Sequence, residues 1–301
     1  MVKIETQSNS ALLGFLATFF SFLLWGILPI YWEKMFYLPF FGVASYRVIW
    51  SFIFISVVIT ATRQWGTVAT IFKDKRAVLL LFVCGMLIAV NWSTYLLAIS
   101  SAHIIESSMG YYINPLANAL IGMIFFRERL RFLQKAAILL ALIGVLYMVI
   151  GYGKVPYIAL ILAFSFAFYA AVHKLVKVSV LDGMFFEMLI ILIPALSYVV
   201  IMSQSGVMPT FMAEPISMKV IIAMGGALTA IPLLGFAFGV QKLPLTTVGV
   251  IQYVSPTVTF LLGVFHFKEP ISTEVLIVFS MIWVGVALYA LDGVLQTTRK
   301  K

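Results

Sequence analysis

The sequence predicts an all-α integral membrane protein with ten transmembrane helices, and three observations carry that prediction. Of 301 residues, 63% are hydrophobic and only 10% are charged, whereas an ordinary soluble domain has about 25% charged residues. Apolar runs of about 20 residues recur along the chain, and each is long enough as a helix to cross a hydrocarbon layer about 30 Å thick. A segment near residue 112 also recurs near residue 253, so the ten helices are expected to form two repeats of five.

The apolar runs are continuous rather than alternating, which favours helices over the strands of a membrane barrel. A polar segment, residues 1–10, precedes them, and a basic tail, residues 293–301, follows them. The longest connectors, 61–76 and 203–217, are too short for a separate enzyme module. In chain order, the expected spans are 11–31, 40–60, 77–99, 104–125, 133–152, 156–176, 183–202, 218–240, 244–266 and 272–292.

The formal net charge is +9, and the basic residues fall mainly on one of the two sides that the span order defines. One side holds FRERLR (126–131), most of the other basic residues and both termini, whereas the other side holds only Lys34, Lys154, Lys219 and Lys268. Because cytoplasmic loops of membrane proteins carry the excess of Lys and Arg, both termini are expected in the cytoplasm. The positive charge is explained by topology, so we expect no nucleic-acid partner.

The internal repeat predicts an inverted architecture. YINPLANALIGMIFFRE (112–128) matches YVSPTVTFLLGVFHFKE (253–269) at six of seventeen positions. Each repeat, 11–152 and 156–292, holds five spans, and because five is odd the second copy enters the membrane in the opposite direction. A pair of inverted repeats allows one half to adopt an inward shape that the other mirrors as an outward shape. The repeat therefore favours a carrier that works by alternating access.

Two ionisable residues lie deep within the spans. Arg47 is about 10 Å from the outer end of span two, and Glu187 occupies the equivalent place in span seven of the inverted repeat. An ionisable group in hydrocarbon costs several kcal/mol, about 3 or more, unless it faces protein or water, so each is a candidate functional residue. For each residue two roles are open. The side chain either contacts the substrate or gates the cavity, or it forms a bond that only stabilises the structure. The inversion places them on opposite sides of the midplane, which argues against a direct salt bridge.

Span four carries Glu106, Asn114 and Asn118 within a sector of about 120°. This polar face either lines a path through the membrane or forms hydrogen bonds between helices. Pro115 and its repeat equivalent Pro256 each remove one helix hydrogen bond, so both spans are expected to be kinked. Glu106 is the candidate proton-coupling group, because burial raises the proton affinity of a carboxyl.

Further side chains combine a hydrogen-bonding group with apolar surface, which is suitable for binding a small organic molecule. They are Asn91, Trp92, Tyr112, Gln252 and Tyr253. No metal site, cofactor site or catalytic constellation is expected. The three histidines are scattered over span ends, no glycine-rich phosphate-binding loop is present, and the single cysteine, Cys84, is expected to pack in an apolar span. These features argue against an enzyme.

Seven short motifs occur in order along nearly the whole chain: WGILPIYWEK (25–34), YRVIWS (46–51), NW (91–92), ESSMGYYINPLANALIGMIFFRERL (106–130), AFSFAFYA (163–170), FFEMLIILIP (185–194) and VIQYVSPTVTFLLGVFHFKEP (250–270). Together they resemble the RarD branch of the EamA transporters, in the drug/metabolite transporter superfamily.

The resemblance implies a ten-helix carrier built from two inverted five-helix EamA repeats, in a bacterial inner membrane, with both termini cytoplasmic. RarD proteins are commonly described as chloramphenicol-sensitivity or chloramphenicol-resistance permeases, and the superfamily exports amino acids, metabolites and drugs. This sequence departs from RarD relatives at Tyr46, where they often have His. That difference weakens any proton relay built on span two.

We therefore expect a secondary active transporter that exports a small organic molecule, such as chloramphenicol, an amino acid or a metabolite, with protons as a candidate coupling partner. An importer or exchanger on the same fold is the alternative. The central cavity is expected to be lined by Arg47, Asn91, Trp92, Tyr112, Asn114, Asn118, Glu187, Gln252 and Tyr253, with Glu106 at its outer mouth.

Overall fold

The computed structural model describes residues 2–35, 37–100, 104–266 and 273–299, and within this part of the chain the secondary structure is helical. The long helices match the expected spans, with most ends shifted by a few residues. Helix α1 begins already at Val2 and α13 continues to Arg299, so both extend into the segments 1–10 and 293–301 that were expected outside the spans. The α-helices are α1 (Val2–Ile27), α2 (Pro29–Trp32), α3 (Phe40–Ala61), α4 (Trp65–Ile71), α5 (Lys75–Ser100), α6 (Ile104–Phe125), α7 (Phe132–Tyr152), α8 (Tyr157–Leu175), α9 (Val180–Gln204), α10 (Ile216–Lys242), α11 (Leu245–Gln252), α12 (Val254–Phe265) and α13 (Thr273–Arg299).

The prediction of ten transmembrane helices is confirmed. Among the described residues, 9 segments are long and apolar enough to cross a membrane, and one of them, Leu245–Leu262, joins α11 to α12. The tenth long helix is α6, with 22 residues. The connector expected at 61–76 contains a short helix, α4, which the sequence did not predict.

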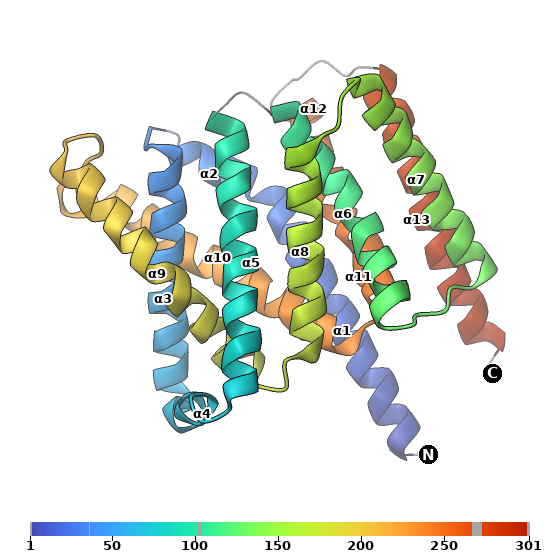
Figure 1. The fold of residues 1–301 in the computed structure, drawn as a ribbon, viewed down its shortest axis with the longest axis horizontal. Helices are drawn as coiled ribbons and strands as arrows, with labels where there is room; N and C mark the ends of the chain where they lie inside the picture. Colours follow the sequence, from blue (N-terminus) through green and yellow to red (C-terminus); the bar gives the residue numbers. More distant parts are fainter. Residues whose placement is uncertain (1, 36, 101–103, 267–272, 300–301) are drawn as a thin grey trace.

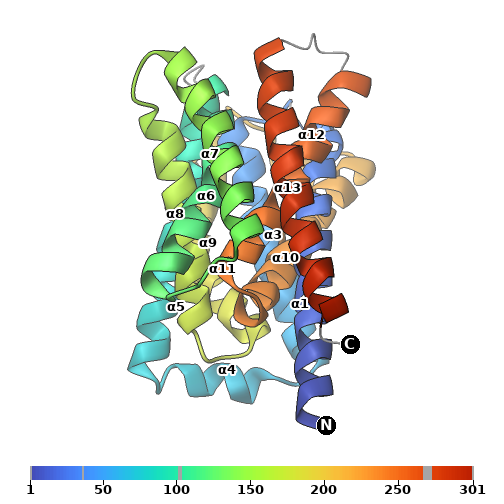
Figure 2. The same ribbon diagram turned by 90° about the vertical axis from the view of Figure 1, so that its right-hand side faces the viewer.

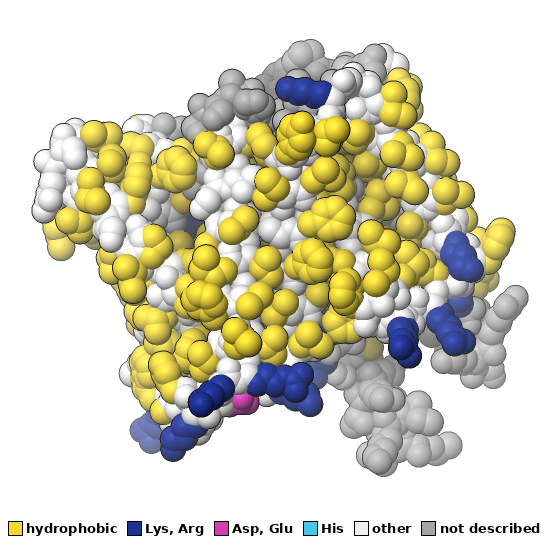
Figure 3. Space-filling model, viewed as in Figure 1, with side chains coloured by type: hydrophobic (Ala, Val, Ile, Leu, Met, Phe, Trp, Pro, Cys, Tyr) yellow, Lys and Arg dark blue, Asp and Glu magenta, His cyan; other side chains and the backbone are white. Residues whose placement is uncertain are grey.

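The ten long elements form one bundle, in which α4 lies across one end (Figures 1 and 2). The start of α1 and the end of α13 lie at this same end of the molecule (Figure 1). Lys and Arg side chains gather along it on the face drawn in Figure 3, and the segments that carry Arg63, Lys73, Arg127 and Lys177 are found there. We call it the basic end.

Helix packing repeats itself between the two halves, as an inverted repeat requires. Helix α1 packs on α10 and α12, and its counterpart α8 packs on α5 and α6. Helix α3 likewise packs on α10, and its counterpart α9 packs on α5. Three further pairs join counterparts directly: α3 with α9, α6 with α11, and α7 with α13. Helix α1 leaves the basic end while α8 runs toward it (Figure 1). These contacts confirm two inverted five-helix repeats.

Equivalent residues of the two repeats meet where the halves face each other. The Tyr253 hydroxyl donates a hydrogen bond of 3.3 Å to the carbonyl oxygen of its counterpart Tyr112. The rings of Trp25 and its counterpart Phe166 lie 6.1 Å apart, and both contact Phe236. Aromatic packing of this kind favours edge or tilted arrangements and buries large apolar areas. The pseudo-two-fold axis therefore passes through a packed aromatic core.

The two repeat prolines lie in different local structure. Span nine is interrupted at Tyr253, between α11 and α12, where the missing N–H of Pro256 leaves the carbonyl of Gln252 without its helical donor. Helix α6 instead continues through Pro115 without an interruption. The Pro115 carbonyl lies against Gly249 of α11, where an added Cβ would be only 2.6 Å from that oxygen. Packing against α11 thus supports the continuous helix.

Glycine allows a close helix crossing between the repeats. A Cβ added to Gly226 of α10 would lie 2.2 Å from the carbonyl carbon of Trp50 on α3. The Ser51 hydroxyl donates a 3.0 Å hydrogen bond to the Gly226 carbonyl at the same crossing. The counterpart crossing places Gly85 of α5 against Ile190 of α9. Small residues let membrane helices approach closely, and van der Waals packing then stabilises the pair.

We predict that Gly226→Ala destabilises the protein by about 1–3 kcal/mol, the usual cost of overpacking. The matched control is Gly151→Ala, because an added Cβ there meets no atom within 4 Å. Thermal unfolding of the purified variants in detergent measures both effects. Equal midpoints for Gly226→Ala and the wild type would show that α3 and α10 do not depend on this crossing.

Candidate functional site

Arg47 lies in a group of aromatic rings in the half of the bundle remote from the basic end. Its guanidinium carbon is 4.6 Å from the ring centroid of Trp32 and 5.0 Å from that of Trp92. Tyr95 and Tyr111 lie close enough to interact with it electrostatically, and their rings are 6.0 Å apart. An arginine cation is attracted to aromatic faces, and this attraction strengthens when water is excluded. We call these five residues the arginine cage.

The guanidinium is held by one hydrogen bond and keeps other donors. Its Nε donates to the Thr229 hydroxyl of α10 at 3.2 Å. With the residues that the structure describes, the two Nη groups form no hydrogen bond. Arg47, Trp32 and Trp92 are partly buried rather than sealed, and Tyr111 is 46% exposed. The arrangement leaves N–H donors beside aromatic rings, a combination that suits a planar anionic group.

Asn91 lies one residue before the cage tryptophan on α5. Its amide nitrogen donates to the Leu162 carbonyl at 2.8 Å and to the Ser165 hydroxyl at 2.9 Å, both on α8. The amide therefore joins two helices, while the side chain stays partly buried.

Three amides form a hydrogen-bonded chain between α6 and α11. The Asn118 nitrogen donates to the Asn114 oxygen at 3.0 Å and to the Gln252 oxygen at 2.9 Å. Asn118 is fully buried, and Asn114 and Gln252 are each 5% exposed. Of the two interpretations left open for the polar face of span four, hydrogen bonding between helices is the one that these contacts match. The side chain of Glu106, on the same face, lies outside the described residues.

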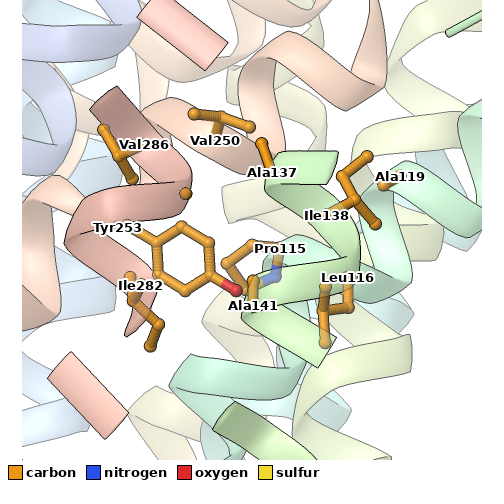
Figure 4. A pocket seen from close by; sticks show the side chains of 11 residues that line it. Pro115, Leu116, Ala119, Ala137, Ile138, Ala141, Val250, Tyr253, Ile282 and Val286 are labelled. Atoms are coloured by element: carbon orange, nitrogen blue, oxygen red, sulfur yellow. The ribbon is translucent and has the colours of Figure 1, made fainter. Parts of the chain in front are cut away.

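Tyr253 closes a narrow apolar crevice beside the amide chain. Its ring lies between Pro115, Ala141 and Ile282 in Figure 4, and the crevice, bounded by α6, α7, α11 and α13, has room for about one water molecule. Tyr253 itself is 4% exposed. In this conformation the crevice is too small for an organic substrate.

Glu187 belongs to a second buried group, in the half nearer the basic end. Its carboxylate accepts a 2.9 Å hydrogen bond from the Tyr169 hydroxyl, and its other oxygen lies 2.8 Å from His173 Nε2. The Cys84 sulfur, the histidine and the carboxylate have ligand atoms within 4.8 Å of one another. Each of the four residues is at most 1% exposed. We call Cys84, Tyr169, His173 and Glu187 the acid cluster.

The arginine cage and the acid cluster are separate. The sequence analysis expected Arg47 and Glu187 to line one cavity, although on opposite sides of the midplane. The structure gives them different partners: Arg47 contacts α2, α5 and α10, whereas Glu187 contacts α5 and α8. The charges are divided between the two halves of the bundle rather than gathered in one pocket.

At the basic end, a carboxylate from the first repeat holds a helix of the second. Glu128 accepts hydrogen bonds from the backbone nitrogens of Leu245 at 2.6 Å and Thr246 at 2.9 Å, and from the Thr246 hydroxyl at 2.6 Å. A carboxylate is favoured there because the first N–H groups of a helix lack helical partners. Nearby, Lys174 of α8 donates to the Leu243 carbonyl. We call these contacts the basic-end closure.

A further ion pair joins the last helix of each repeat at this end. Arg131, which precedes α7, pairs with Asp292 of α13, and its Nε donates to that carboxylate at 2.6 Å. The hydrogen bond from Arg131 to Asp292 raises the pKa of the Arg131 guanidinium.

Comparison with known proteins places this fold and these residues in a family. Residues 154–291 match the model of the EamA-like transporter family. The uncharacterized transporter YojE of Bacillus subtilis is 37% identical over 93% of this chain and 94% of its own length. Protein RarD of Salmonella typhi is 38% identical over 98% of this chain and 99% of its own. The chain belongs to the RarD branch of the EamA transporter family.

More distant matches agree with that assignment. The chloramphenicol-sensitive protein RarD of Pseudomonas aeruginosa is 29% identical over 83% of this chain and 84% of its own length. A protein of known crystal structure superimposes with a TM-score of 0.68 over 95% of this chain and 98% of its own, at 19% identity, which shows a shared fold alone. This RarD-branch chain is therefore a membrane transporter of the drug/metabolite type.

Sequence reasoning missed several partners in this RarD-branch transporter: Trp32, Thr229, Tyr169, His173 and Glu128. The sequence predicts only that His173 is one of three histidines scattered over span ends. In the structure it lies at about the same depth as Glu187, on the adjacent helix. For Glu128, the repeated Arg–Glu and Lys–Glu pairs that end the matched segments were the available signal. The acid cluster had no such signal, because its members come from three spans.

We predict that Glu128→Ala loosens the start of α11. Hydrogen bonds to a charged group contribute about 1.5–3 kcal/mol, so the Leu245 and Thr246 amides should exchange their hydrogens about 10- to 100-fold faster. Hydrogen–deuterium exchange with mass spectrometry measures this in the purified protein. Glu33→Ala, which removes an exposed carboxylate from the opposite end, is the control. Unchanged exchange in Glu128→Ala would exclude this carboxylate as the cap.

Proposed function

We propose that this transporter exports a small organic molecule from the cytoplasm by alternating access, and that the arginine cage binds it. The observation that carries the proposal is the guanidinium of Arg47, which is partly accessible, stacked between two tryptophans and hydrogen-bonded through Nε alone among described residues. A buried cation is costly unless an anion or aromatic ring compensates it. The remaining N–H groups of Arg47 can donate hydrogen bonds to a transported molecule.

The chemistry of the cage favours a substrate with an aromatic or apolar body and a carboxylate or similar acidic group. Arginine presents N–H groups in a planar fork that matches a carboxylate. Trp32, Trp92, Tyr95 and Tyr111 offer rings for the rest of the molecule. An aromatic amino acid or an aromatic acid satisfies both conditions. Chloramphenicol, which appears in the name of one relative, has the aromatic body but no carboxylate.

Alternating access follows from the symmetry of the repeats in this proposal. The basic-end closure seals the bundle beneath the acid cluster, while the arginine cage lies in the other half. Exchange of conformations between the repeats would open the closure and cover the cage. The same fold can transport a substrate in either direction, because the gradients set the direction of a carrier. An importer or exchanger is therefore the alternative.

We predict that cells producing this protein accumulate less of at least one labelled compound from a panel of chloramphenicol, phenylalanine and an aromatic acid. Arg47→Ala removes the cation, and Arg47→Lys keeps charge without the planar fork, so both should raise accumulation toward that of cells lacking the protein. A loss of two bonds to a charged group corresponds to about tenfold or more in apparent affinity.

The matched control is Arg76→Ala, which removes an exposed arginine outside the cage. Export by this variant should equal that of the wild type at equal protein levels. Increased accumulation in producing cells would favour import. Transport that Arg47→Ala leaves unchanged would exclude the cage as the binding site.

We further propose that the protein lies in a bacterial inner membrane with the basic end, and hence both termini, in the cytoplasm. The support is the concentration of Lys and Arg in the segments at that end. A fluorescent protein fused after Lys301 should therefore fluoresce, whereas alkaline phosphatase at the same place should be inactive. The opposite pair of results would reverse the orientation. Fusions in the 153–155 turn, at the opposite end, serve as the control.

A further inference from the structure

The acid cluster contains buried ligand atoms that have no partner among the residues that the structure describes. Cys84, His173 and Glu187 are each at most 1% exposed. Glu187 Oε1 and His173 Nε2 lie 2.8 Å apart, yet neither atom forms a hydrogen bond, and the same holds for His173 Nδ1. A buried polar atom without a partner costs about 1–3 kcal/mol. A bound ion is one way in which a protein avoids that cost.

The carboxylate of Glu187 also lacks a compensating positive charge. Among the described contacts no lysine or arginine reaches it, and its hydrogen bond comes from the Tyr169 hydroxyl. The Cys84 sulfur lies within 4.8 Å of the ligand atoms of His173 and Glu187. A divalent cation bound to a thiolate and a carboxylate makes the site neutral, because two negative charges balance two positive ones. Neutrality matters here, since an uncompensated buried charge is costly.

We propose that Cys84, His173 and Glu187 bind one Zn²⁺ ion. Thiolate sulfur, imidazole nitrogen and carboxylate oxygen are the ligands that zinc takes in proteins, whereas Ca²⁺ and Mg²⁺ prefer oxygen alone. The thiol proton leaves to water as the ion binds. The sequence analysis expected no metal site, because the three ligands come from three different spans. Zinc binding does not depend on which substrate the carrier moves or in which direction.

The three ligand atoms lie close to coordination distance. In a tetrahedral zinc site, bond lengths of about 2.0–2.3 Å place neighbouring ligand atoms about 3.5 Å apart. His173 Nε2 and Glu187 Oε1 are nearer than this, at 2.8 Å, and all three ligand atoms lie within 4.8 Å of one another. Side-chain shifts of about 1 Å therefore bring the three atoms to an ion. Three protein ligands leave one coordination position for water.

Tyr169 supports the ligands from one turn before His173 on α8. Its hydroxyl donates to Glu187 Oε2 at 2.9 Å, which leaves Oε1 for the metal. Its ring lies 4.6 Å from the His173 ring, centroid to centroid, and stacks on Phe236 of α10. Coordination through Nε2 places the imidazole hydrogen on Nδ1. Contacts that orient a ligand in this way raise metal affinity about 10- to 100-fold.

The ion joins the two repeats. Cys84 belongs to α5 of the first repeat, whereas His173 and Glu187 belong to α8 and α9 of the second, and α5 packs on both helices (Figure 1). His173 lies in the last turn of α8, which runs toward the basic end, so the ion reaches the site from that end. A ligand that binds only the folded state stabilises it. Zn²⁺ therefore holds α5, α8 and α9 together.

The zinc content of the purified full chain tests the site. After removal of any affinity tag, the protein in detergent is stripped with a chelator, equilibrated with Zn²⁺ and freed of excess metal, and its zinc is measured by elemental mass spectrometry. We expect one zinc per chain in the wild type and an affinity lower by about tenfold or more in Cys84→Ser and Glu187→Gln. His266→Ala, which removes an exposed histidine from the opposite end, is the control and should bind as the wild type does. A wild type that binds no zinc, or equal binding by all variants, would overturn the proposal.

Cobalt identifies one of the ligands directly. Co²⁺ occupies zinc sites, and a bond to a thiolate adds an intense charge-transfer band to its absorption spectrum. The sequence contains a single cysteine, so this band can arise only from Cys84. We expect the band in the wild type and in His266→Ala, and its loss in Cys84→Ser. Cobalt that binds to the wild type without the band would place the ion elsewhere and contradict the site.

Thermal unfolding separates a lost site from a lost fold. In the presence of chelator, Cys84→Ser and Glu187→Gln should each unfold in a cooperative transition. Added Zn²⁺ should raise the unfolding midpoint of the wild type and His266→Ala, and leave those two variants unchanged. Equal zinc-induced shifts in all four proteins would count against the site. The cobalt band of the wild type needs no variant, so it decides the proposal even where a substitution prevents folding.

Discussion

Hydrocarbon offers no hydrogen-bond partner, so the buried polar side chains inside the spans of this protein depend on groups of the protein itself. The constraint explains the arrangement of the buried polar residues. Arg47 is compensated by aromatic rings and Thr229, and Glu187 by Tyr169 and His173. Asn118 is compensated by two other amides. Each arrangement joins at least two helices, so the same contacts that satisfy polar atoms also fix how the bundle packs.

The two repeats share a scaffold but differ in chemistry. Their helices pair in matching ways, and equivalent residues such as Tyr112 and Tyr253 meet near the axis. At neighbouring positions of the counterpart helices α3 and α9, one repeat holds an arginine and the other a glutamate. The shared scaffold therefore carries a buried cation in one half and a buried acidic residue in the other.

The basic-end closure relates these two halves to a conformational change. Its strongest element is a carboxylate from one repeat that caps a short helix of the other, so it breaks only when the repeats move apart. Lys174 reaches the same turn from α8, so the closure is joined to the helix that carries Tyr169 and His173. Population shifts in a two-state carrier need only a few kcal/mol of difference between states, and contacts of this kind supply about that amount.

The sequence by itself determined the membrane class, the ten spans and the inverted repeat, because hydropathy and a long-range match are properties of the chain. It also identified Arg47 and Glu187 as unusual, since charges within apolar runs are costly wherever they fold. Only the tertiary structure decided their partners. Trp32, Thr229, Tyr169 and His173 come from other helices, and no periodicity within one span indicates which face of another span it will meet. The split between a cage and a cluster is therefore a consequence of packing.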